Sequence, residues 1–499
     1  MKLWQKFAVA LTAATLFYGG QLRMWTDARN RFLEHWNRSD ALSLIVGIVG
    51  IALLFTGLRE LLKRRPHLQR AADHLFLLLL GMGVVSTFLT YADYKTELLF
   101  LGLVAIASAS WFRPQWRIPR RAAVVALIFS PAVLILGNQL LRYPSWHSEE
   151  GAPAIMGGEK SSPVFIFVFD EWSYDRSTEN GKLLPLFKNL GGLAQQSWTF
   201  EHAQSAGPRT DVSLPRFLWQ RSDDMIIGAG DTYWMQDGVR KLTSAVPSLF
   251  AMAGERGYNT ALRGFYLPYR QMLGSQVGSC ISYLEHPKAD TFVHKVWANG
   301  LRNLGFQHDP VSRKLSKIFE KSVFLQSREG YSKHWEKINR SLRNDTLKLL
   351  EEAHDNTLAF IHFPLPHGPW IFSADGTYTG PFKGARMSHD VEGYRNHLAY
   401  LDVVIGQFLD TLRKTGKFDS STIIITSDHS WRQDSTSEGH LHDGEDVRHV
   451  PLFIKLPDQR EPGRVSSKFE LIKLQPILDA VMIGRVEEAQ AALNSLKSN

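Results

Sequence analysis

The first 142 residues contain five apolar stretches, each bounded by charged residues. These stretches lie at about residues 7–20, 41–58, 74–92, 98–112 and 122–141. The second, third and fifth approach the roughly 20 apolar residues that a bilayer span requires, and the shorter two need their flanking residues to cross. Runs such as ALSLIVGIVGIALLFTGL are apolar on every helical face, which favours membrane spans over core helices. We therefore predict an α-helical membrane domain of about five spans over residues 1–142.

Basic residues between the stretches predict the direction of the spans. Two basic clusters follow the second and fourth stretches: Arg59, Lys63, Arg64, Arg65 and Arg70, and then Arg113, Arg117, Arg120 and Arg121. Short loops rich in Lys and Arg tend to stay in the cytoplasm. With Lys2 and Lys6 also inside, five alternating spans place everything after Leu141 on the far side of the membrane.

The rest of the chain follows a different pattern. Residues 143–162 contain Pro, Gly and Ser without a sustained period, which is typical of a linker. Three short, uniformly apolar runs follow, as expected of strands buried on both faces of a parallel sheet: Val164–Phe169, Thr357–His362 and Ser421–Ser427. Apolar residues recur at helical spacing through Tyr394–Lys414. Residues 163–499 are therefore predicted to form an α/β domain with a mainly parallel central sheet and helices on both faces.

The distribution of charge along the chain disfavours nucleic-acid binding. The chain has 57 Lys and Arg against 49 Asp and Glu, a surplus of +8. Residues 1–142 hold 17 basic and 7 acidic residues, a balance of +10, whereas residues 143–499 hold 40 and 42, a balance of −2. Since the large C-terminal part has no positive surplus, nucleic-acid binding is disfavoured. Cys280 is the one cysteine, so the chain forms no internal disulfide.

Side chains that can bind a metal follow each of the three predicted strands. They are Asp170-Glu171, His362 with His367, and Asp428-His429. Open α/β sheets place their sites at the carboxyl ends of the strands, so we expect these side chains to meet. Carboxylate oxygens and imidazole nitrogens together suit Zn²⁺ or a similar cation. Taken singly, each residue is also consistent with a packed histidine or a solvated acidic loop.

A hydroxyl group stands where a helix is expected to begin. In GPRTDVSLPRFL, Thr210 follows a Gly-Pro turn and Ser213 comes three residues later. Such a position exposes a hydroxyl beside helix N-terminal amides, which favour a bound anion. A simple N-cap role for either residue is the alternative.

Four motifs occur in a fixed order along the C-terminal part. They are T-x-x-S-x-P from Thr210 to Pro215, H-x-x-x-x-H-G-P from His362 to Pro369, Y-x-N from Tyr394 to Asn396, and S-D-H from Ser427 to His429. Together with the strand that ends in Asp170-Glu171, they resemble the alkaline phosphatase and sulfatase superfamily. More narrowly, they resemble its membrane-anchored periplasmic phosphoethanolamine transferases and their sulfatase-like relatives. The resemblance spans about residues 163–457. The five predicted spans that precede this part are also similar to those of the transferases.

The chain departs from both subfamilies at particular residues. The acidic pair Asp170-Glu171 stands where the transferases usually have one glutamate, and Ser430 stands where a glycine is usual. The cysteines that form disulfides in many such transferases are missing. A sulfatase of this superfamily oxidises a cysteine or serine to formylglycine, and Thr210 cannot be converted in this way. The resemblance therefore predicts the superfamily and leaves the subfamily open.

The resemblance implies a metal-dependent reaction in which Thr210 is the nucleophile. The metal ligands that it implies are Asp170, Glu171, Thr210, Asp428, His429 and His440. The resemblance implies His367 and His442 as catalytic residues in addition to Thr210. His440 and His442 are alternatives for binding a second metal or protonating the leaving alcohol. Ser213, His362 and His367 are the expected substrate-binding residues. Zn²⁺ is the expected cofactor, with Mn²⁺ or another divalent cation as the alternative.

Three functions follow as hypotheses. The leading one is a transferase that moves phosphoethanolamine, or another phospho-alcohol, from a phospholipid to an envelope glycan or lipid A-like acceptor. Its expected location is the bacterial inner membrane with the catalytic domain in the periplasm, where tethering beside the bilayer raises the effective concentration of a lipid donor. A membrane-anchored phosphodiesterase or sulfatase-like hydrolase is the second. A catalytically inactive assembly partner for envelope polysaccharide machinery is the third.

Overall fold

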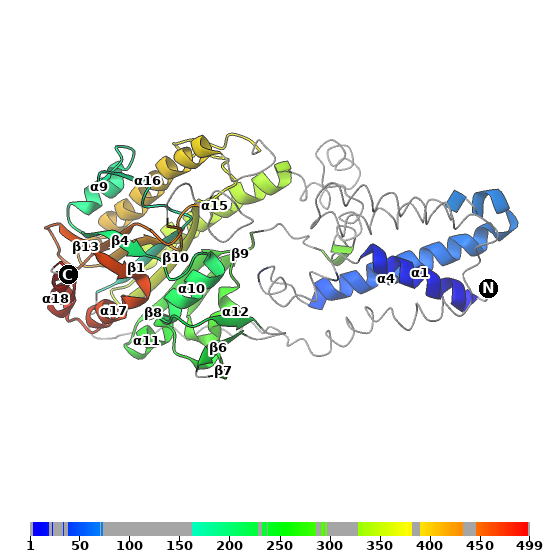
Figure 1. Cartoon of the computed structure of the whole chain (residues 1–499), viewed down its shortest axis with the longest axis horizontal. Coiled ribbons are helices and arrows are strands. Elements are labelled where there is room, and N and C mark those ends of the chain that lie inside the picture. The colour runs from blue at the N-terminus through cyan, green and yellow to red at the C-terminus, as the bar shows by residue number, and fades with distance from the viewer. Residues whose placement is uncertain are drawn as a thin grey trace. The chain divides into compact units, whose positions relative to one another are not determined.

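The computed structural model describes residues 3–18, 22, 33, 38–69, 71–72, 162–227, 232–236, 238–285, 291–293, 295–296, 328–381, 390–432 and 446–497. The chain divides into two compact units (Figure 1). The first consists of residues 1–146 with 286–331, and the second of residues 147–285 with 332–499. Each unit is described by itself below.

Two apolar helices pack together in the first unit. They are α1 (Leu3–Phe17) and α4 (Arg38–Leu61), and a short 3-10 turn, Leu62–Arg64, continues α4. Lys6 near the start of α1 pairs with Glu60 near the end of α4, so the two helices run antiparallel. Small residues such as Ala10, Ala14 and Ala41 lie buried in their interface, which lets the helices approach closely.

The membrane prediction is tested in part by these helices. Among the described residues, one helix, Arg38–Arg64, is long and apolar enough to cross a membrane, with a mean hydropathy of 2.5 over its most apolar window. It matches the second predicted span, and its Leu54 side chain is 72% exposed, as suits a lipid-facing surface. Helix α1 contains residues 7–17 of the first predicted span and has 15 residues in all. The predicted spans at 74–92, 98–112 and 122–141 lie outside the described residues, so the five-span arrangement stays a prediction.

An eight-stranded sheet forms the centre of the second unit. Its strands lie in the order β13-β4-β12-β11-β1-β10-β8-β9. The five pairings other than those of β12 are parallel, and β12 runs antiparallel to both of its neighbours. The bounds are β1 Val164–Asp170, β4 Trp198–Gln204, β8 Asn259–Phe265, β9 Ser279–Tyr283, β10 Thr357–Pro366, β11 Thr422–Ser427, β12 Leu452–Lys455 and β13 Gly463–Glu470. The three predicted strands are therefore the adjacent strands β11, β1 and β10.

Helices and two small antiparallel sheets surround the central sheet. The helices are α9 Lys188–Ala194, α10 Thr210–Trp219, α11 Leu249–Glu255, α12 Tyr269–Leu273, α15 Arg328–Glu352, α16 Val391–Lys414, α17 Gln475–Met482 and α18 Val486–Ser495. The small sheets pair β2 (Thr178–Glu179) with β3 (Lys182–Leu183), and join β5 (Met225–Ile227), β6 (Thr232–Gln236) and β7 (Val239–Leu242). Short 3-10 turns occur at Thr243–Ala245, Gly274–Gln276 and Leu471–Lys473.

Aromatic contacts show that helices cover both faces of the sheet. On β10, Phe360 contacts Phe217 of α10 and Phe250 of α11, with ring centroids 5.8 and 6.3 Å apart. Phe363 is three residues further along and so on the opposite face, where its ring centroid lies 5.9 Å from that of Phe408 on α16. Figure 1 shows α9 and α16 on one side of the sheet and α10 and α11 on the other. The predicted α/β domain with a mainly parallel sheet is confirmed.

A buried carboxylate joins the long helix α16 to the start of α9. Asp402, which is 3% exposed, accepts hydrogen bonds from the backbone N–H groups of Asn189 and Leu190, at 3.0 and 2.9 Å. The side-chain amide of Asn189 donates to the same carboxylate at 3.1 Å. Asp402 thus satisfies N–H groups that the first turn of α9 leaves without a partner in its own helix.

We expect Asp402→Ala to lower the free energy of unfolding by about 2–3 kcal/mol, because buried N–H groups lose their acceptor. Denaturant unfolding of the full chain, followed by tryptophan fluorescence, measures this loss. Asp410→Ala is the matched control, since Asp410 lies on the same helix with its side chain 60% exposed and pairs with Arg413. We expect the control to change stability by less than about 0.5 kcal/mol. Equal effects of the two substitutions would contradict the capping role.

Candidate active site

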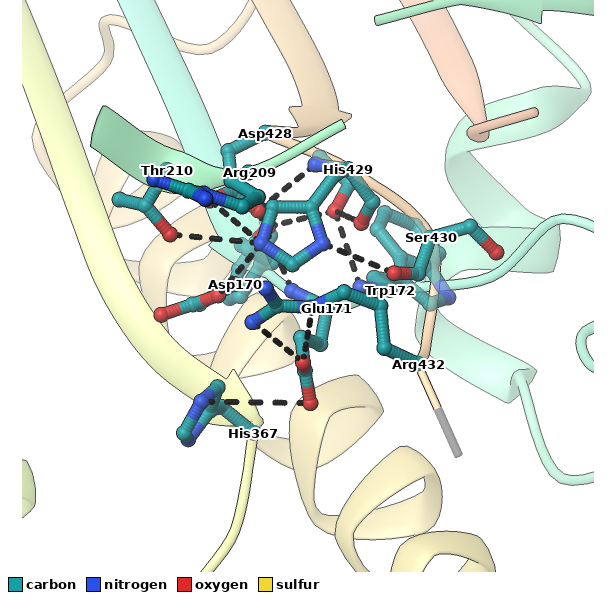
Figure 2. A network of polar contacts seen from close by, with 12 residues as sticks. Asp170, Glu171, Trp172, Arg209, Thr210, His367, Asp428, His429, Ser430 and Arg432 are labelled. Carbon is teal, nitrogen blue, oxygen red and sulfur yellow. Dashed lines mark hydrogen bonds and ion pairs between the residues drawn. The ribbon is translucent and has the colours of Figure 1, made fainter. Parts of the chain in front are cut away.

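The carboxyl ends of β11, β1 and β10 carry the polar residues of the site (Figure 2). Phe169 of β1 pairs in register with Ser427 of β11. Asp170 directly follows Phe169 in the chain, and Asp428 directly follows Ser427. Ser427 Oγ lies 2.6 Å from the carbonyl oxygen of Phe169 and 2.7 Å from that of His429, and it accepts a hydrogen bond from the Trp172 N–H at 2.9 Å. One buried hydroxyl therefore holds the two strand ends together.

The turn after β1 adopts an uncommon backbone conformation that a tyrosine holds in place. Glu171 has a positive φ of 62°, in a backbone region that residues other than glycine seldom adopt. The Tyr394 hydroxyl on α16 donates to the carbonyl oxygen of Glu171 at 2.8 Å and accepts from the N–H of Ser173 at 3.1 Å. On the other side, the Glu171 N–H donates to Asp428 Oδ1 at 3.2 Å. Tyr394, the first residue of the Y-x-N motif, thus fixes the turn that directs Asp170 into the site.

Three buried polar atoms at the strand ends lack hydrogen-bond partners among the described residues. They are Asp170 Oδ1, Asp428 Oδ2 and His362 Nε2. Ligand atoms of these three residues all lie within 4.8 Å of one another. Unpaired buried carboxylates are costly, and a divalent cation is the ordinary means of offsetting that cost.

His429 and Thr210 extend this group. His429 Nε2 lies 3.7 Å from Asp170 Oδ1, 3.4 Å from Asp428 Oδ2 and 3.3 Å from Thr210 Oγ1. The other ring nitrogen, Nδ1, lies 2.8 Å from the carbonyl oxygen of Ser430, which can only accept. Nδ1 therefore carries the proton, and the lone pair of Nε2 points toward the carboxylates and the Thr210 hydroxyl.

Burial sets the protonation of this group. Burial, followed by the repulsion between charged carboxylates, raises the pKa of Asp170 and of Asp428 well above the usual range. Burial also lowers the pKa of His362 to about 3 and holds the pKa of His429 well below its usual range, where the charge of Arg432 adds to the effect. The imidazoles are therefore neutral at physiological pH, as metal ligands must be, and the carboxyl groups favour a cation that replaces their protons.

These residues fit a divalent metal ion. Asp170 and Asp428 offer two carboxylates, and His429 offers an imidazole nitrogen 3.7 Å from Asp170 Oδ1 and 3.4 Å from Asp428 Oδ2, beside Thr210 at the first position of α10. This donor set matches the oxygen and nitrogen ligands of zinc sites. His362 Nε2 is a further candidate ligand, although the sequence indicates a substrate-binding role for it.

Glu171 and His367 lie at the edge of the group. Glu171 Oε1 forms an ion pair with Arg432, at 3.0 Å from Nε and 2.9 Å from Nη2. Glu171 Oε2 lies 4.0 Å from His367 Nε2. The His367 ring stacks on Trp335 of α15, with centroids 5.5 Å apart and planes inclined by 4°. The backbone N–H of His367 donates to the carbonyl oxygen of Asp170 at 3.1 Å.

The remaining candidates fall in different places. Ser213 is buried one turn after Thr210 on α10. His440 and His442 lie outside the described residues. His449 lies with Nδ1 3.0 Å from Asp175 and Nε2 2.7 Å from the carbonyl oxygen of Glu201, outside the group of metal-binding side chains.

Sequence reasoning missed two residues that contact the site. Tyr269 on α12 places its hydroxyl 2.8 Å from His362 Nδ1, but it lies 93 residues earlier in the chain and in no local pattern with His362. Arg432 follows His429 by three residues, so a basic residue shortly after the S-D-H motif was the available signal.

The fold and this site define a member of the alkaline phosphatase and sulfatase superfamily, whose members are hydrolases and transferases of phosphate and sulfate esters. The sulfatase family model matches residues 163–476, which is more than half of the chain. The protein therefore belongs to the sulfatase family.

Several solved structures are similar to the chain at low sequence identity. The PsFucS1 sulfatase from Pseudoalteromonas sp. is 16% identical with a TM-score of 0.43, over 66% of this chain and 69% of that one. The phosphonate monoester hydrolase of Agrobacterium radiobacter is 16% identical with a TM-score of 0.41, over 64% and 73%. The lipoteichoic acid synthase LtaP from Listeria monocytogenes is 15% identical with a TM-score of 0.37, over 66% and 73%. No curated protein matches the chain.

We expect zinc to stabilise the protein against heat and EDTA to reverse this effect. Zinc at 100 times its dissociation constant adds about 2.7 kcal/mol of stability, which raises the melting temperature by a few degrees. Asp428→Asn should abolish the zinc-induced shift, and without metal it should melt at the same or a higher temperature because it removes one of two repelling carboxylates. Asp410→Asn, at an exposed position of α16, should keep the full shift. A zinc shift that survives in Asp428→Asn would contradict this site.

The zinc-induced shift should shrink as the pH falls from about 7 to 5. Protons and zinc compete for Asp170 and Asp428, whose pKa values are raised above the ordinary 3.8, so acid favours the protonated, metal-free form. Melting curves at a fixed zinc concentration across this range measure the effect. A shift that is constant over the range would show that zinc binds groups other than these carboxylates.

Proposed function

We propose that the protein is a metal-dependent transferase that uses Thr210 to move a phospho-alcohol group from a phospholipid to an envelope glycan or lipid acceptor. The observation that carries the proposal is the position of the Thr210 hydroxyl, 3.3 Å from the unprotonated Nε2 of His429 and beside the buried Asp170 and Asp428. A threonine hydroxyl is a weak nucleophile unless a base or metal activates it, and this environment supplies carboxylate and imidazole ligands for such a metal.

The chain's own residues suggest how the reaction would proceed. A bound divalent cation would lower the pKa of the nucleophile and screen the charge of the phosphoryl group. Thr210 Oγ1 forms a bond to phosphorus while the bond from phosphorus to the diacylglycerol oxygen breaks, which leaves a phosphothreonine. The Thr210 hydroxyl gives up its proton to solvent as the new bond forms, because His429 Nε2, 3.3 Å away, would itself hold the cation. The acceptor hydroxyl then attacks the same phosphorus, the bond from phosphorus to Thr210 Oγ1 breaks, and the acceptor's proton goes to the released Thr210 oxygen.

Protonation of the leaving alcohol falls to His367 in this scheme. Its Nε2 is 4.0 Å from Glu171 Oε2, its ring is fixed against Trp335, and its side chain is 21% exposed, so it can exchange protons with solvent. His440 and His442 stay candidates for a second metal or for this proton transfer.

The membrane setting supports a lipid donor. Helix α4 is the candidate span, and the basic residues Arg59, Lys63 and Arg64 at its end favour a cytoplasmic location for that end. The proposed location is the bacterial inner membrane with the catalytic unit in the periplasm.

Hydrolysis is the second candidate, because water can replace the acceptor in the second step without any change in the first. A formylglycine sulfatase is disfavoured, since Thr210 occupies the nucleophile position and the single cysteine, Cys280, lies on β9. A catalytically inactive assembly partner is disfavoured by the intact cluster of Thr210, Asp428 and His429.

The detergent-solubilised full chain, loaded with zinc and given phosphatidylethanolamine labelled in its ethanolamine, tests the proposal. We expect mass spectrometry to find the label on Thr210 together with free diacylglycerol. Thr210→Ala should reduce diacylglycerol release by roughly 10³-fold or more, and Thr210→Ser should retain part of it.

Thr411→Ala is the matched control, because the Thr411 hydroxyl, as far as the described residues go, bonds within α16, to the carbonyl oxygen of Gln407 at 2.9 Å. It should leave the rate unchanged. Diacylglycerol release that is undiminished in Thr210→Ala would overturn the assignment of the nucleophile. Release of free phosphoethanolamine without any acceptor would identify the hydrolase instead.

A further inference from the structure

The site contains a fixed positive charge that neither the motifs nor the reaction scheme assigns. Arg432 follows Trp431 in the segment after β11. Its Nη2 and Nε atoms lie 2.9 and 3.0 Å from Glu171 Oε1. The side chains of Arg432 and Glu171 are only 19% and 8% exposed. Figure 2 shows Arg432 and Glu171 next to Asp170 and His429.

Two aromatic contacts hold the backbone that carries Arg432. The Trp431 ring stacks on Tyr394, with centroids 4.3 Å apart and planes inclined by 10°, and meets Trp370 edge-on at 6.1 Å. Tyr394 also bonds the carbonyl oxygen of Glu171, at 2.8 Å. The same tyrosine therefore fixes both partners of the ion pair, so the guanidinium is held in place before any substrate binds.

The Glu171 carboxylate faces Arg432 and not the unpaired atoms of Asp170, His362 and Asp428 described above. The compact group of ligand atoms consists of Asp170, His362 and Asp428, without Glu171. Both oxygens of Glu171 face other groups: Oε1 contacts Arg432, and Oε2 lies 4.0 Å from His367 Nε2. The second acid of the Asp170-Glu171 pair thus has a partner of its own.

Arg432 retains binding capacity beyond this pair. Its hydrogen bonds to described residues use Nε and Nη2, and Nη1 makes none within the described part of the chain. Its charge reaches the metal group, where it favours the ionised form of Asp170 and opposes protonation of His429. A planar guanidinium with unused N–H donors matches the oxygens of a phosphoryl or sulfuryl group.

We propose that Arg432 binds the tetrahedral oxyanion of the substrate and that Glu171 positions it, so that one metal ion and one arginine share the negative charge of the transferred group. This inference deepens the proposed function, since it assigns the binding of the group that Thr210 attacks. Glu171 is then a positioning residue and does not ligate the metal.

The experiment measures anion binding and metal content separately, in the zinc-loaded full chain. Inorganic phosphate and inorganic sulfate are the probes, titrated by calorimetry, and metal per chain is determined by mass spectrometry. The variants are Arg432→Ala, Arg432→Lys and Glu171→Gln. Arg256→Ala is the matched control, because Arg256 forms a comparable pair with Asp479 at 3.0 Å, is 28% exposed and lies away from the site.

We expect Arg432→Ala to weaken binding of both anions by about tenfold or more and Arg432→Lys to weaken it less, because lysine keeps the charge but loses the planar fork. Glu171→Gln should weaken anion binding in the same direction, since the guanidinium loses its anchor. Zinc content should be unchanged in all of these variants, and Arg256→Ala should match the wild type in both measurements. Melting curves of each zinc-loaded variant confirm that it is folded.

Two results would overturn the inference. One is a loss of zinc in Glu171→Gln, which would make Glu171 a metal ligand. The other is wild-type anion affinity in folded Arg432→Ala. Neither measurement requires turnover, so this inference can fail while Thr210 is still labelled by the phospholipid, and it can hold if Thr210 is not.

Discussion

The structure of the catalytic unit depends on one costly feature, the burial of Asp170 and Asp428 side by side at the ends of two adjacent strands. They are 3% and 1% exposed, and each has an oxygen without a hydrogen-bond partner in the described part of the chain. Two like charges in a poorly solvated interior repel strongly, and burial alone already penalises each of them. Protonation or a bound cation relieves this repulsion, and a cation that fits the site replaces the protons, so the acids, the neutral histidines and the metal are linked.

Much of the surrounding structure offsets the cost of burying these two acids or fixes the geometry of the site. Asp428 Oδ1 accepts from the N–H groups of Glu171 and His429, at 3.2 and 2.8 Å. Ser427 ties the two strand ends together, and Tyr394 holds the strained turn at Glu171. Arg432 brings a positive charge close to the acids through its pair with Glu171. The buried aromatic residues around these contacts exclude water, which strengthens each interaction in the site.

The sequence predicted the features that have strong local signals. The apolar runs at β1, β10 and β11 identified the centre of the sheet, and the polar residues directly after them identified where the site lies. Contacts between distant segments had no such signal: the Tyr269–His362 bond and the position of Tyr394 depend on how helices pack on the sheet. The pairing of Glu171 with Arg432 was missed for a different reason. An acidic pair after a strand suggests two ligands, and only the structure shows that one of them faces an arginine.

Anomalous diffraction at the zinc edge, from crystals of the zinc-loaded full chain, locates the metal itself. We expect a peak bounded by Asp170, Asp428 and His429, with oxygen and nitrogen ligands at about 2.0–2.2 Å and Thr210 Oγ1 adjacent to it. We also expect Glu171 to remain paired with Arg432 in the same crystals. A peak elsewhere in the chain, or no ordered zinc between the two aspartates, would contradict a metal site at these strand ends.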